Sequence, residues 1–533
     1  MGDRKNIFRD FWFWPAMLAG GFFLMLTLWY GSGVNSAIFS YAAWVWKHYH
    51  LPPYVGAWDP SFPGIFFIHQ LALELFGAGF FGFRLFDFVV QMSSLCMIFY
   101  LSRRLANASI AGFFAALSYG IYYFGLGSLE SGEQEGFLLW LLLLTMVVSV
   151  GLKERGLLRA FLSGILLGLA LTLQPIYGLC GPVFGVWFFR QGLRNRPGRV
   201  WVELGVFKFS WLLPALAIIF YYWRLGYPGR LFQAAVSFNW FFLRASDFSV
   251  FGAQPQWAMA ITVVNYIFMQ QPVVMFSALL AVLLAPKTLK DPETRSVYRV
   301  LSALIIIGLA SYLIPGKYFP HQLTVFFGLL MVLSGAGLAG VGSELKNHDS
   351  GVRGGIFAGT FYLAIAGFML LYINPKSVDF AALYSFGSLD RAHSAGNNFD
   401  AYYYRLAKQL KPVLQDKDEV EYFGWQPLLP YLLEKKIPSR FCSVPYLVMR
   451  SKDGETDPLQ REWINEYSDA VIKARPRFFL ISGNVPEWEM YNLKGPGLKQ
   501  ALHENFPELE KFWASNYLFK GRSGEIEVYE LKP

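Results

Sequence analysis

Long apolar segments separated by short polar loops occupy the first two thirds of this 533-residue chain. Each is close to the length that an α-helix needs to cross the hydrocarbon core of a bilayer, and together they predict a polytopic α-helical membrane protein with about eleven transmembrane helices. The eighth is the weakest, because Trp257–Phe268 also fits a surface helix leading into it. The segments lie near 11–30, 82–101, 106–125, 135–151, 157–173, 176–190, 201–222, 268–286, 299–315, 320–342 and 355–373.

The loop after the first apolar segment, Tyr30–Gly77, has an internal pattern of its own. Polar residues and four prolines (Pro52, Pro53, Pro60, Pro63) exclude a continuous helix through it. Apolar residues recur at helical spacing on both sides of the prolines, which predicts two amphipathic helices at the membrane surface joined by a turn at Trp58-Asp59. The alternative is a long loop that caps the bundle. The apolar positions are Phe39, Ala42, Ala43, Trp46, Ile65, Ile68, Leu71 and Leu75.

From about Asn374 the pattern becomes that of a soluble domain. Buried strands are predicted at 419–424 and 477–482, helices at 400–414, 428–436 and 458–475, and a terminal hairpin at 517–531. Alternating strands and helices predict a soluble α/β domain at 374–533, after a transmembrane domain at 1–373. We expect this domain to act as a lid or docking surface, because it carries no phosphate-binding loop and no metal-ligand spacing.

Composition and charge agree with a membrane protein. The chain is 54% hydrophobic and 16% charged, with a mean hydropathy of +0.35, which excludes an ordinary soluble protein of this length. A net charge of +9 does not indicate nucleic-acid binding, because the basic residues lie in short loops between apolar segments. The three cysteines exclude a disulfide framework.

The basic loops also predict an orientation. The N-terminal segment MGDRKNIFRD is basic and precedes a full-length apolar segment, so we interpret it as a retained signal anchor with the N-terminus in the cytoplasm. Most basic residues then fall on cytoplasmic ends, as the positive-inside rule requires. An odd number of spans places the C-terminal domain outside, on the same side as loops 31–81, 126–135, 223–267 and 315–320.

Two acidic motifs on that outer side could carry chemistry. Asp59 lies in the rigid turn Trp58–Pro63, where a carboxylate can act as a general base or bind a metal; the alternative is an ordinary turn or helix cap. Glu130, Glu133 and Glu135 lie between two apolar segments, where carboxylates are costly unless solvated, paired or used. The alternative for Glu133 and Glu135 is that they compensate the dipole of the following helix.

Two basic motifs share the same side. Lys317 and His321, in Gly316–Gln322, suit the phosphate of an anionic lipid; interfacial anchoring is the alternative. The loop 223–256 contains Arg224, Arg230 and Arg244 among many aromatic residues, a mixture that suits a sugar or lipid carrier but also describes an interfacial belt.

Several short motifs resemble the integral-membrane C-type glycosyltransferases, in particular the bacterial branch related to protein O-mannosyltransferases and aminoarabinose transferases. The resemblance covers nearly the whole chain. An acid at Glu133 or Glu135 would fill the place of the family's second-loop acid. The remaining matching motifs are Pro53-Tyr54, Trp58-Asp59, Phe62-Pro63-Gly64, Leu75-Phe76-Gly77, Arg84-Leu85, Gln174-Pro175, Gly316–His321 and Phe423–Pro427.

One position departs from the family pattern. The family's usual catalytic Asp, at the start of the first outer loop, corresponds here to Asn35 or Ser36. Neither an amide nor a hydroxyl is a general base of ordinary strength. Asp59, Glu133 or Glu135 would therefore take that part, or transfer activity has been lost.

The resemblance implies an enzyme of the bacterial inner membrane that uses a polyprenyl-phosphate-sugar donor and a glycan, lipid or protein acceptor. Lys317, His321 and either Arg84 or Arg244 would bind the donor phosphate, and Asp59, Glu133 or Glu135 would deprotonate the acceptor. No ligand cluster demands a metal, although a divalent ion stays open as a cofactor. The alternatives are a non-catalytic scaffold subunit and a lipid-carrier transporter, for which Asp87 is the candidate mid-span acid.

Overall fold

A computed structural model describes residues 7–245, 250–252, 255–288, 291–348, 352–371, 401–451, 454, 456–483 and 497–533. The chain forms two compact units. Unit 1 comprises Met1–Tyr30, Arg84–Ala217 and Gln254–Val378. Unit 2 comprises Gly31–Phe83, Ile218–Ala253 and Asp379–Pro533.

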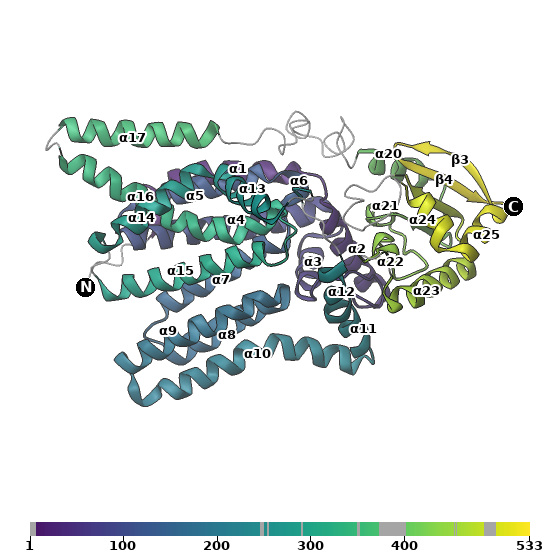
Figure 1. Ribbon diagram of the computed structural model, residues 1–533, viewed down its shortest axis with the longest axis horizontal. Helices are drawn as coiled ribbons and strands as arrows, with labels where there is room; N and C mark the ends of the chain where they lie inside the picture. The colour runs from purple at the N-terminus through teal and green to yellow at the C-terminus, as the bar shows by residue number, and fades with distance from the viewer. Residues whose placement is uncertain are drawn as a thin grey trace. The chain divides into compact units, whose positions relative to one another are not determined.

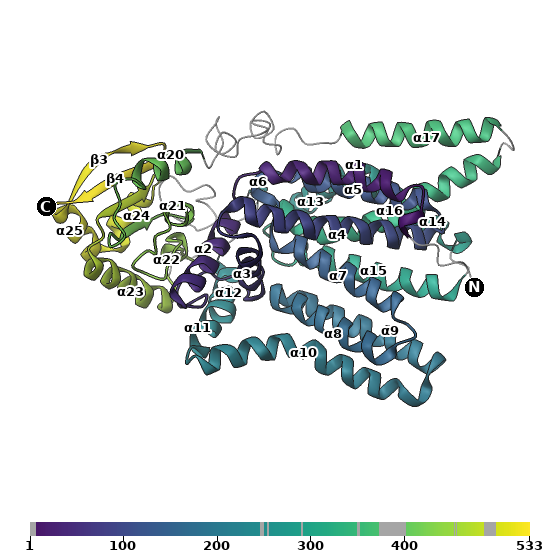
Figure 2. The same ribbon diagram turned by 180° about the vertical axis from the view of Figure 1, so that it is seen from behind.

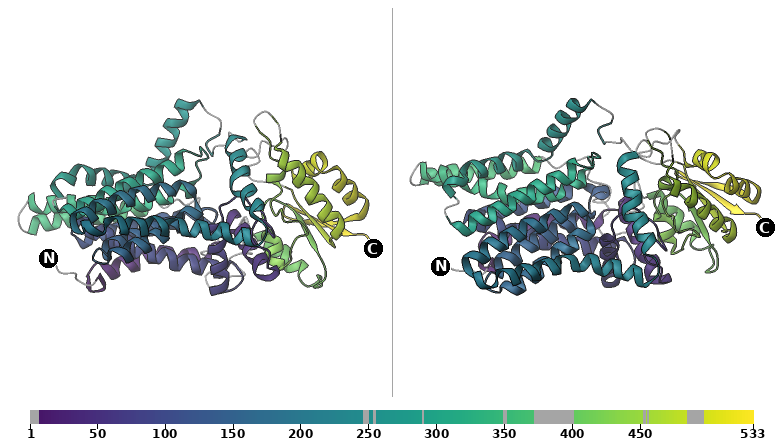
Figure 3. Two further views of the ribbon diagram at one scale, coloured as in Figure 1. Left: turned by 90° about the horizontal axis from the view of Figure 1, so that it is seen from below. Right: turned by 60° about the horizontal axis from the view of Figure 1, so that its bottom comes forward.

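Unit 1 is built from long apolar helices. In Figures 1 and 2, α1, α5 and α16 run lengthwise beside one another, and Figure 3 shows the same bundle from two further directions. Its helices are α1 (Phe13–Leu26), α4 (Phe80–Ala106), α5 (Ser109–Gly125), α6 (Gly127–Glu130), α7 (Gln134–Gly151), α8 (Gly156–Leu173), α9 (Cys180–Asn195), α10 (Val200–Arg224), α13 (Gln256–Gln270), α14 (Pro272–Thr288), α15 (Pro292–Leu313), α16 (Thr324–His348) and α17 (Val352–Leu371). Short 3₁₀ turns include η1 (Ile7–Arg9), η2 (Thr27–Trp29), η3 (Pro175–Leu179), η4 (Pro197–Arg199) and η6 (Pro320–Leu323).

The predicted multi-span helical architecture is confirmed. Within the described residues, seven helices are long and apolar enough to cross a membrane, or up to nine if each of two bent helix pairs counts as one span. Every predicted apolar segment lies in helix, but α5 and α9 have only 17 and 16 residues, so the count of eleven stays a prediction. The eighth segment is α14, and α13 precedes it across a 92° bend.

Helix α16 is the centre of unit 1. Of its apolar window 83% is buried, against 22% for α10 and 17% for α17, which leave most of their apolar surface uncovered. A run of small residues, Ser334–Gly337, lets α16 approach its neighbours closely. A Cβ atom on Gly335 or Gly337 would collide with a backbone oxygen of α5 or α14. Small residues at such crossings are typical of membrane helix packing.

Unit 2 begins with the two predicted helices of the first loop. They are α2 (Val34–Tyr49) and α3 (Gly64–Phe76). Helix α2 is buried on all sides from Ser36 to Val45, which is more than the predicted face, whereas α3 buries Ile65 and His69 and leaves Leu71 and Leu75 exposed. The apolar stripe of α3 is therefore split between core and surface, as expected of a helix lying at a membrane interface. The segment 228–245 adds α11 (Pro228–Phe232), a π-helical turn η5 (Gln233–Phe238) and α12 (Asn239–Ala245).

The C-terminal part of unit 2 is the predicted α/β layer. A four-stranded sheet has the order β1-β2-β4-β3, in which β1 and β2 are parallel and the other pairs antiparallel. The predicted strands and hairpin are confirmed; α22, α24 and α25 were not predicted. The elements are α20 (Ala401–Leu410), β1 (Val420–Phe423), α21 (Leu428–Leu433), α22 (Pro445–Val448), α23 (Pro458–Ala474), β2 (Phe478–Ser482), α24 (Leu498–Asn505), α25 (Pro507–Asn516), β3 (Tyr517–Ser523) and β4 (Ile526–Leu531).

Within unit 2 the first loop folds together with the C-terminal segment. Trp58 is fully buried, and its backbone N–H donates to the Arg440 carbonyl at 2.7 Å. The Trp58 ring packs between Phe238 and Trp463, with centroids 5.0 and 4.9 Å away. The Tyr41 hydroxyl accepts from the N–H of Ile437 at 2.9 Å. Unit 2 therefore combines segments from both predicted domains. The predicted boundary between residues 373 and 374 lies outside the described residues and stays a prediction.

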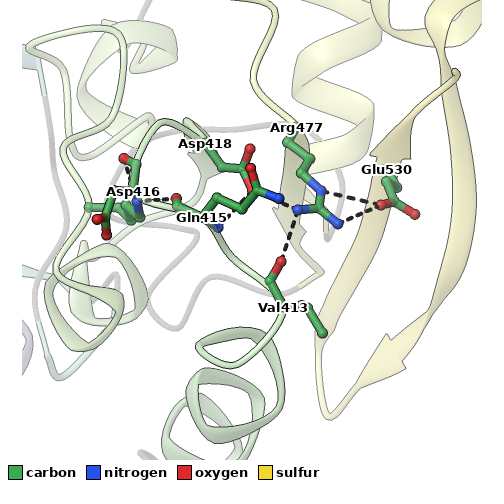
Figure 4. A network of polar contacts seen from close by, with 7 residues as sticks. Val413, Gln415, Asp416, Asp418, Arg477 and Glu530 are labelled. Atoms are coloured by element: carbon green, nitrogen blue, oxygen red, sulfur yellow. Dashed lines mark hydrogen bonds and ion pairs between the residues drawn. The ribbon is translucent and has the colours of Figure 1, made fainter.

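Arg477 ties the start of β2 to its surroundings (Figure 4). Its guanidinium donates to Asp418 at 2.6 Å and to the carbonyl of Val413 at 2.8 Å, and lies 3.4 Å from Glu530. Slight burial opposes the shift, but hydrogen bonds from Gln415 and Arg477 hold the pKa of the Asp418 carboxyl below its usual range. The contribution of the Arg477–Asp418 ion pair to stability is therefore present above about pH 4 and is lost as the pH falls through the lowered pKa of Asp418.

We expect Arg477→Met to destabilise the C-terminal sheet by about 0.5–1 kcal/mol, a small effect because solvent screens these exposed charges. The loss should be visible at pH 7 and should shrink below pH 4. Hydrogen exchange of β2 and β4 at both pH values measures it. Lys511→Met, which removes another exposed cation, is the control. An equal effect of Arg477→Met at pH 7 and pH 3 would contradict the electrostatic origin.

Candidate functional site

The loop between α5 and α7 is fixed in unit 1 by Arg84. This side chain is 1% exposed, and its guanidinium donates to the Ser131 carbonyl and hydroxyl and to the Ser128 carbonyl, each at 3.0 Å. The N–H of Gly132 donates to the Tyr123 hydroxyl at 2.9 Å. Two buried side chains therefore hold the backbone that carries the three predicted glutamates. The observed donors of Arg84 point to loop oxygens, and its predicted contact with a donor phosphate is untested.

Asp87, the acid that a transporter would use, is completely buried and fully engaged. Its carboxylate accepts from the Tyr123 hydroxyl at 2.8 and 2.9 Å and from the Gln91 amide at 2.8 Å. The Gln91 carbonyl accepts in turn from Tyr119. A buried carboxylate with this many donors rigidifies its surroundings. The network supports a structural role for Asp87 and gives no support to the transport alternative.

Glu130 is the direct partner of His321. One Glu130 carboxylate oxygen lies 2.5 Å from His321 Nδ1 and 3.1 Å from the His321 backbone N–H. Burial alone would raise the pKa of the Glu130 carboxyl, but the charge and hydrogen bonds of His321 outweigh it and hold that pKa below its usual range. His321 also interacts electrostatically with Glu135 and Glu133. The structure therefore brings the predicted acidic loop and the predicted basic loop into one cluster.

Lys317 precedes this cluster in an unusual stretch of backbone. Its side chain is 4% exposed, and its neighbours Gly316 and Tyr318 both have left-handed backbone, with φ of 67° and 62°. Such a conformation is strained for a tyrosine and is found preferentially at functional sites. A buried cation in a strained turn, four residues before His321 in the sequence, is an arrangement that suits a bound anion.

Several buried polar atoms at this end of unit 1 have no hydrogen-bond partner among the described residues. The elements that carry them are neighbours: η6 contacts α7 and α15, and η3 contacts α8 and α15. Buried polar groups are nearly always satisfied in folded proteins, so a group of exceptions in one place indicates a site for a polar ligand. We call this set the unsatisfied polar residues: Gln134 Oε1, Glu135 Oε2, Gln174 Oε1, Tyr312 Oη and Gln322 Oε1.

Glu133 and Glu135 occupy the start of α7. Glu133 is its N-cap residue but makes no side-chain capping bond, and Glu135 is in the first turn. Both are almost fully buried, at 4% and 2% exposed. Compensation of the helix dipole accounts for their position but not for their burial, because burying two carboxylates costs much more than that compensation returns.

Asp59 lies in unit 2, in the turn after Trp58. Its carboxylate accepts from the N–H of Ser61 at 2.9 Å, the local bond by which an Asp stabilises a turn. It is 3% exposed, and burial raises the pKa of its carboxyl to about 6 although hydrogen bonds from Ser61 oppose the shift. Stabilisation of the turn therefore accounts for the position of Asp59, and a catalytic role for this carboxylate stays a prediction.

We expect Asp59 to make stability fall with rising pH. The folded state keeps this proton up to about pH 6, while the unfolded chain loses it near 3.8, so the folded state binds more protons between these values. Asp59→Asn keeps the bond from Ser61 and should raise stability at pH 7 by on the order of 1–3 kcal/mol. Thermal unfolding of the detergent-solubilised protein between pH 4 and 8 tests this. Superimposable profiles of the variant and wild type would contradict it.

The remaining predicted residues lie in unit 2. The side chain of Arg244 is outside the described residues. Arg230 pairs with Glu466 at 3.1 Å, and Phe238 is buried against Trp58. Phe232 and Trp240 are 60% and 59% exposed, so the aromatic loop is divided between core and surface. Asn35 and Ser36 lie in the first turn of α2.

We looked for side chains that could hold a metal ion in the part of the chain that the structure describes. There, no group of three or more His, Cys, Asp or Glu side chains is arranged to hold an ion. No chemical step below depends on a metal.

Sequence reasoning missed the pairing of Glu130 with His321 and the buried amide oxygens among the unsatisfied polar residues. Gln174 and Gln322 were visible within motifs that resemble the family, but an amide carries no signal of burial by itself. Glu130 was visible in the acidic motif, and only the three-dimensional contact distinguishes it from Glu133 and Glu135.

Comparison with known proteins supports the fold. The family described as dolichyl-phosphate-mannose-protein mannosyltransferase matches residues 59–223. No curated protein matches the sequence.

Two solved structures cover almost the whole chain. One is ArnT from Cupriavidus metallidurans bound to undecaprenyl phosphate, with 12% identity, a TM-score of 0.56 and 97% of each chain covered. The other is the oligosaccharyltransferase AglB from Archaeoglobus fulgidus in complex with an inhibitory peptide and a dolichol-phosphate, with 10% identity and a TM-score of 0.54, covering 98% of this chain and 74% of the other. The resemblance inferred from the sequence is thereby confirmed for the fold.

Proposed function

Since the chain has the fold of the integral-membrane C-type glycosyltransferases, we propose that it transfers a sugar from a polyprenyl-phosphate-linked donor to an acceptor hydroxyl. The observation that carries the proposal is the polar end of unit 1, where the Glu130–His321 pair and the turn of Lys317 lie on the elements that also carry the unsatisfied polar residues. The two similar structures, one bound to undecaprenyl phosphate and one to a dolichol-phosphate, support a lipid phosphate as the ligand class.

In this proposal Lys317 and His321 bind the donor phosphate. Opposite charge and fixed donors stabilise the negative charge that grows on the phosphate oxygen as the sugar–phosphate bond breaks. Glu130 orients the imidazole, because it accepts from both the ring nitrogen and the backbone N–H of the same histidine. The polyprenyl phosphate leaves with the bonding electrons.

Glu135 or Glu133 accepts the proton of the acceptor hydroxyl as its oxygen bonds to the anomeric carbon. We prefer these two to Asp59, because the Asp59 carboxylate is engaged in its own turn. A single in-line displacement inverts the anomeric configuration. Amides among the unsatisfied polar residues, such as Gln174 and Gln322, supply hydrogen bonds to sugar hydroxyls.

We place the protein in a bacterial inner membrane with the polar end of unit 1 and the C-terminal domain on the outer side. The basic loops support this orientation through the positive-inside rule. The donor sugar and the acceptor, whether glycan, lipid or protein, are open in this proposal.

The experiment is transfer by the purified full-length protein from a radiolabelled polyprenyl-phosphate-sugar, assayed with a panel of donors and acceptors. Chelator-treated and metal-supplemented samples are run in parallel. Transfer that is lost when His321 is replaced by Ala but retained in Asp59→Asn supports the proposal. Binding of the lipid phosphate without turnover in any condition would favour the non-catalytic scaffold, which the replacement at Asn35 or Ser36 allows.

A further inference from the structure

A large basic cavity lies at the end of unit 1 where α7 and α9 finish and α15 begins. Its volume is about 830 Å³. It is distinct from the region of the unsatisfied polar residues, because α7 begins among those residues and ends beside this cavity. Its charged lining consists of Lys153, Glu154, Arg190, Arg194, Arg196, Asp291, Glu293, Arg295 and Arg299.

The three carboxylates of the lining are already engaged. Glu293 pairs with Lys153 at 3.0 Å and with Arg104 at 2.7 Å. Glu154 pairs with Arg196 at 3.7 Å. Asp291 caps α15, accepting from the Thr294 N–H at 2.8 Å and from the Thr294 hydroxyl at 2.9 Å. Six cations against three carboxylates leave the cavity positive.

The excess charge comes from arginines at helical spacing on two neighbouring helices. Arg190 and Arg194 are four residues apart on α9, and Arg295 and Arg299 are four apart on α15, so each pair shares one helix face. Helices α9 and α15 pack against each other, and both pairs line the cavity. Among the described residues, Arg190, Arg194 and Arg299 have no ion-pair partner.

The position of Arg295 strengthens the case for an anion. It lies in the first turns of α15, where the positive end of the helix dipole disfavours a cation. Arg194, by contrast, is in the last turn of α9, where the dipole favours it. The positive end of α15 adds to the charge of the four arginines, whereas the negative ends of α7 and α9 offset that addition. The arginines therefore carry the excess positive charge, and a bound anion would relieve their repulsion.

We propose that this cavity is a binding site for a phosphate ester, separate from the site of sugar transfer. Its guanidinium groups can bind phosphate oxygens in pairs, which ammonium groups cannot do. Basic pockets between membrane helices on the cytoplasmic side are known binding places for anionic lipid head groups, and a soluble phosphate ester carries the same chemistry. Solvated arginines that only set membrane orientation are the competing explanation.

Two triple variants distinguish these explanations. Arg190→Gln/Arg194→Gln/Arg299→Gln removes three cavity cations that make no ion pair among the described residues, so folding should survive. Arg155→Gln/Arg199→Gln/Lys346→Gln removes three exposed cations outside the cavity lining and is the matched control for net charge. Circular dichroism and thermal unfolding verify that both variants are folded.

The full-length protein is reconstituted in nanodiscs of phosphatidylcholine, with and without phosphatidylglycerol. Native mass spectrometry counts the phosphatidylglycerol retained by the released protein, and calorimetry on pure phosphatidylcholine discs measures binding of inorganic pyrophosphate. We expect the cavity variant to bind at least about tenfold more weakly than both wild type and control. If the cavity variant loses binding of phosphatidylglycerol only, the ligand is a membrane head group. If it loses binding of pyrophosphate only, the ligand is a soluble phosphate ester.

Three results would overturn the proposal. In the first, the wild-type protein binds neither phosphatidylglycerol nor pyrophosphate. In the second, the cavity variant and its control lose binding equally. In the third, the cavity variant binds both ligands as well as the wild type does. Transfer activity is assayed in parallel. A protein that retains the anion but transfers no sugar keeps this proposal while removing the proposed function, so the two fail separately.

Discussion

Sugar transfer by Glu135→Gln is expected to fall by about 10²- to 10⁴-fold, the range that loss of a general base produces. Glutamine keeps the size of the side chain and its ability to accept hydrogen bonds, but it cannot take a proton at neutral pH. The same substitution at Glu133 is made in parallel, because both carboxylates are buried at the start of α7 and sequence alone does not separate them. Initial rates under saturating donor measure kcat.

The matched control is Glu130→Gln. Its carboxylate serves His321, so this variant should change the KM for the lipid donor as well as kcat, whereas loss of the base should lower kcat with little change in KM. If Glu133→Gln and Glu135→Gln both retain the full rate, no acid of this loop is the base. In that case Asp59→Asn decides whether the remaining predicted acid acts.

Arg84→Met is expected to destabilise unit 1 by about 2–6 kcal/mol, because it leaves two backbone carbonyls of the loop without their donor, at a cost of about 1–3 kcal/mol each. The substitution leaves the Ser128 and Ser131 carbonyls without their donor and leaves Asp87 without the nearest positive charge. Thermal unfolding in detergent with a second, chemical denaturant series measures the loss. Arg84→Lys should recover part of it, since lysine keeps the charge but not the forked geometry.

Kinetics of the Arg84 variants separate its two roles. A residue that positions the glutamate loop should lower kcat when replaced, because the general base is misplaced. If Arg84 instead binds the donor phosphate, its replacement should raise the KM for the donor and leave the thermal stability nearly unchanged. Unchanged stability with a raised KM would therefore contradict the positioning role and support the phosphate contact predicted from the sequence.

Much of the fold could be predicted from the sequence because its signals are local. Twenty-residue apolar segments, prolines at Pro52 and Pro53, and alternating patterns such as 419–424 each act on their own stretch of chain. The packing of Trp58 could not be predicted, since its partners Phe441 and Trp463 are far away in sequence and look like any other core aromatics. The exposed stripe of α3 was misjudged for a similar reason: periodicity locates an apolar face but does not say whether protein or lipid covers it.

Sequence patterns locate the candidate site at the level of loops rather than atoms, and the roles of its residues stay predictions. The structure joins the acidic motif and the basic motif through the Glu130–His321 contact. The choice among Glu130, Glu133 and Glu135 depends on backbone geometry within six residues. Burial of Gln174 and Tyr312 depends on four helices at once, which no single motif encodes.

The joint packing of the first loop and the C-terminal segment sets an order of events during synthesis. The thiol of Cys442 donates to the carbonyl of Trp58, 384 positions earlier in the sequence. The ribosome therefore completes the whole helical bundle before the C-terminal partners of Trp58 exist, and until then Phe238 alone of its two flanking rings is available to cover the indole. A premature stop codon anywhere ahead of Arg440 would consequently damage a loop encoded far upstream of it.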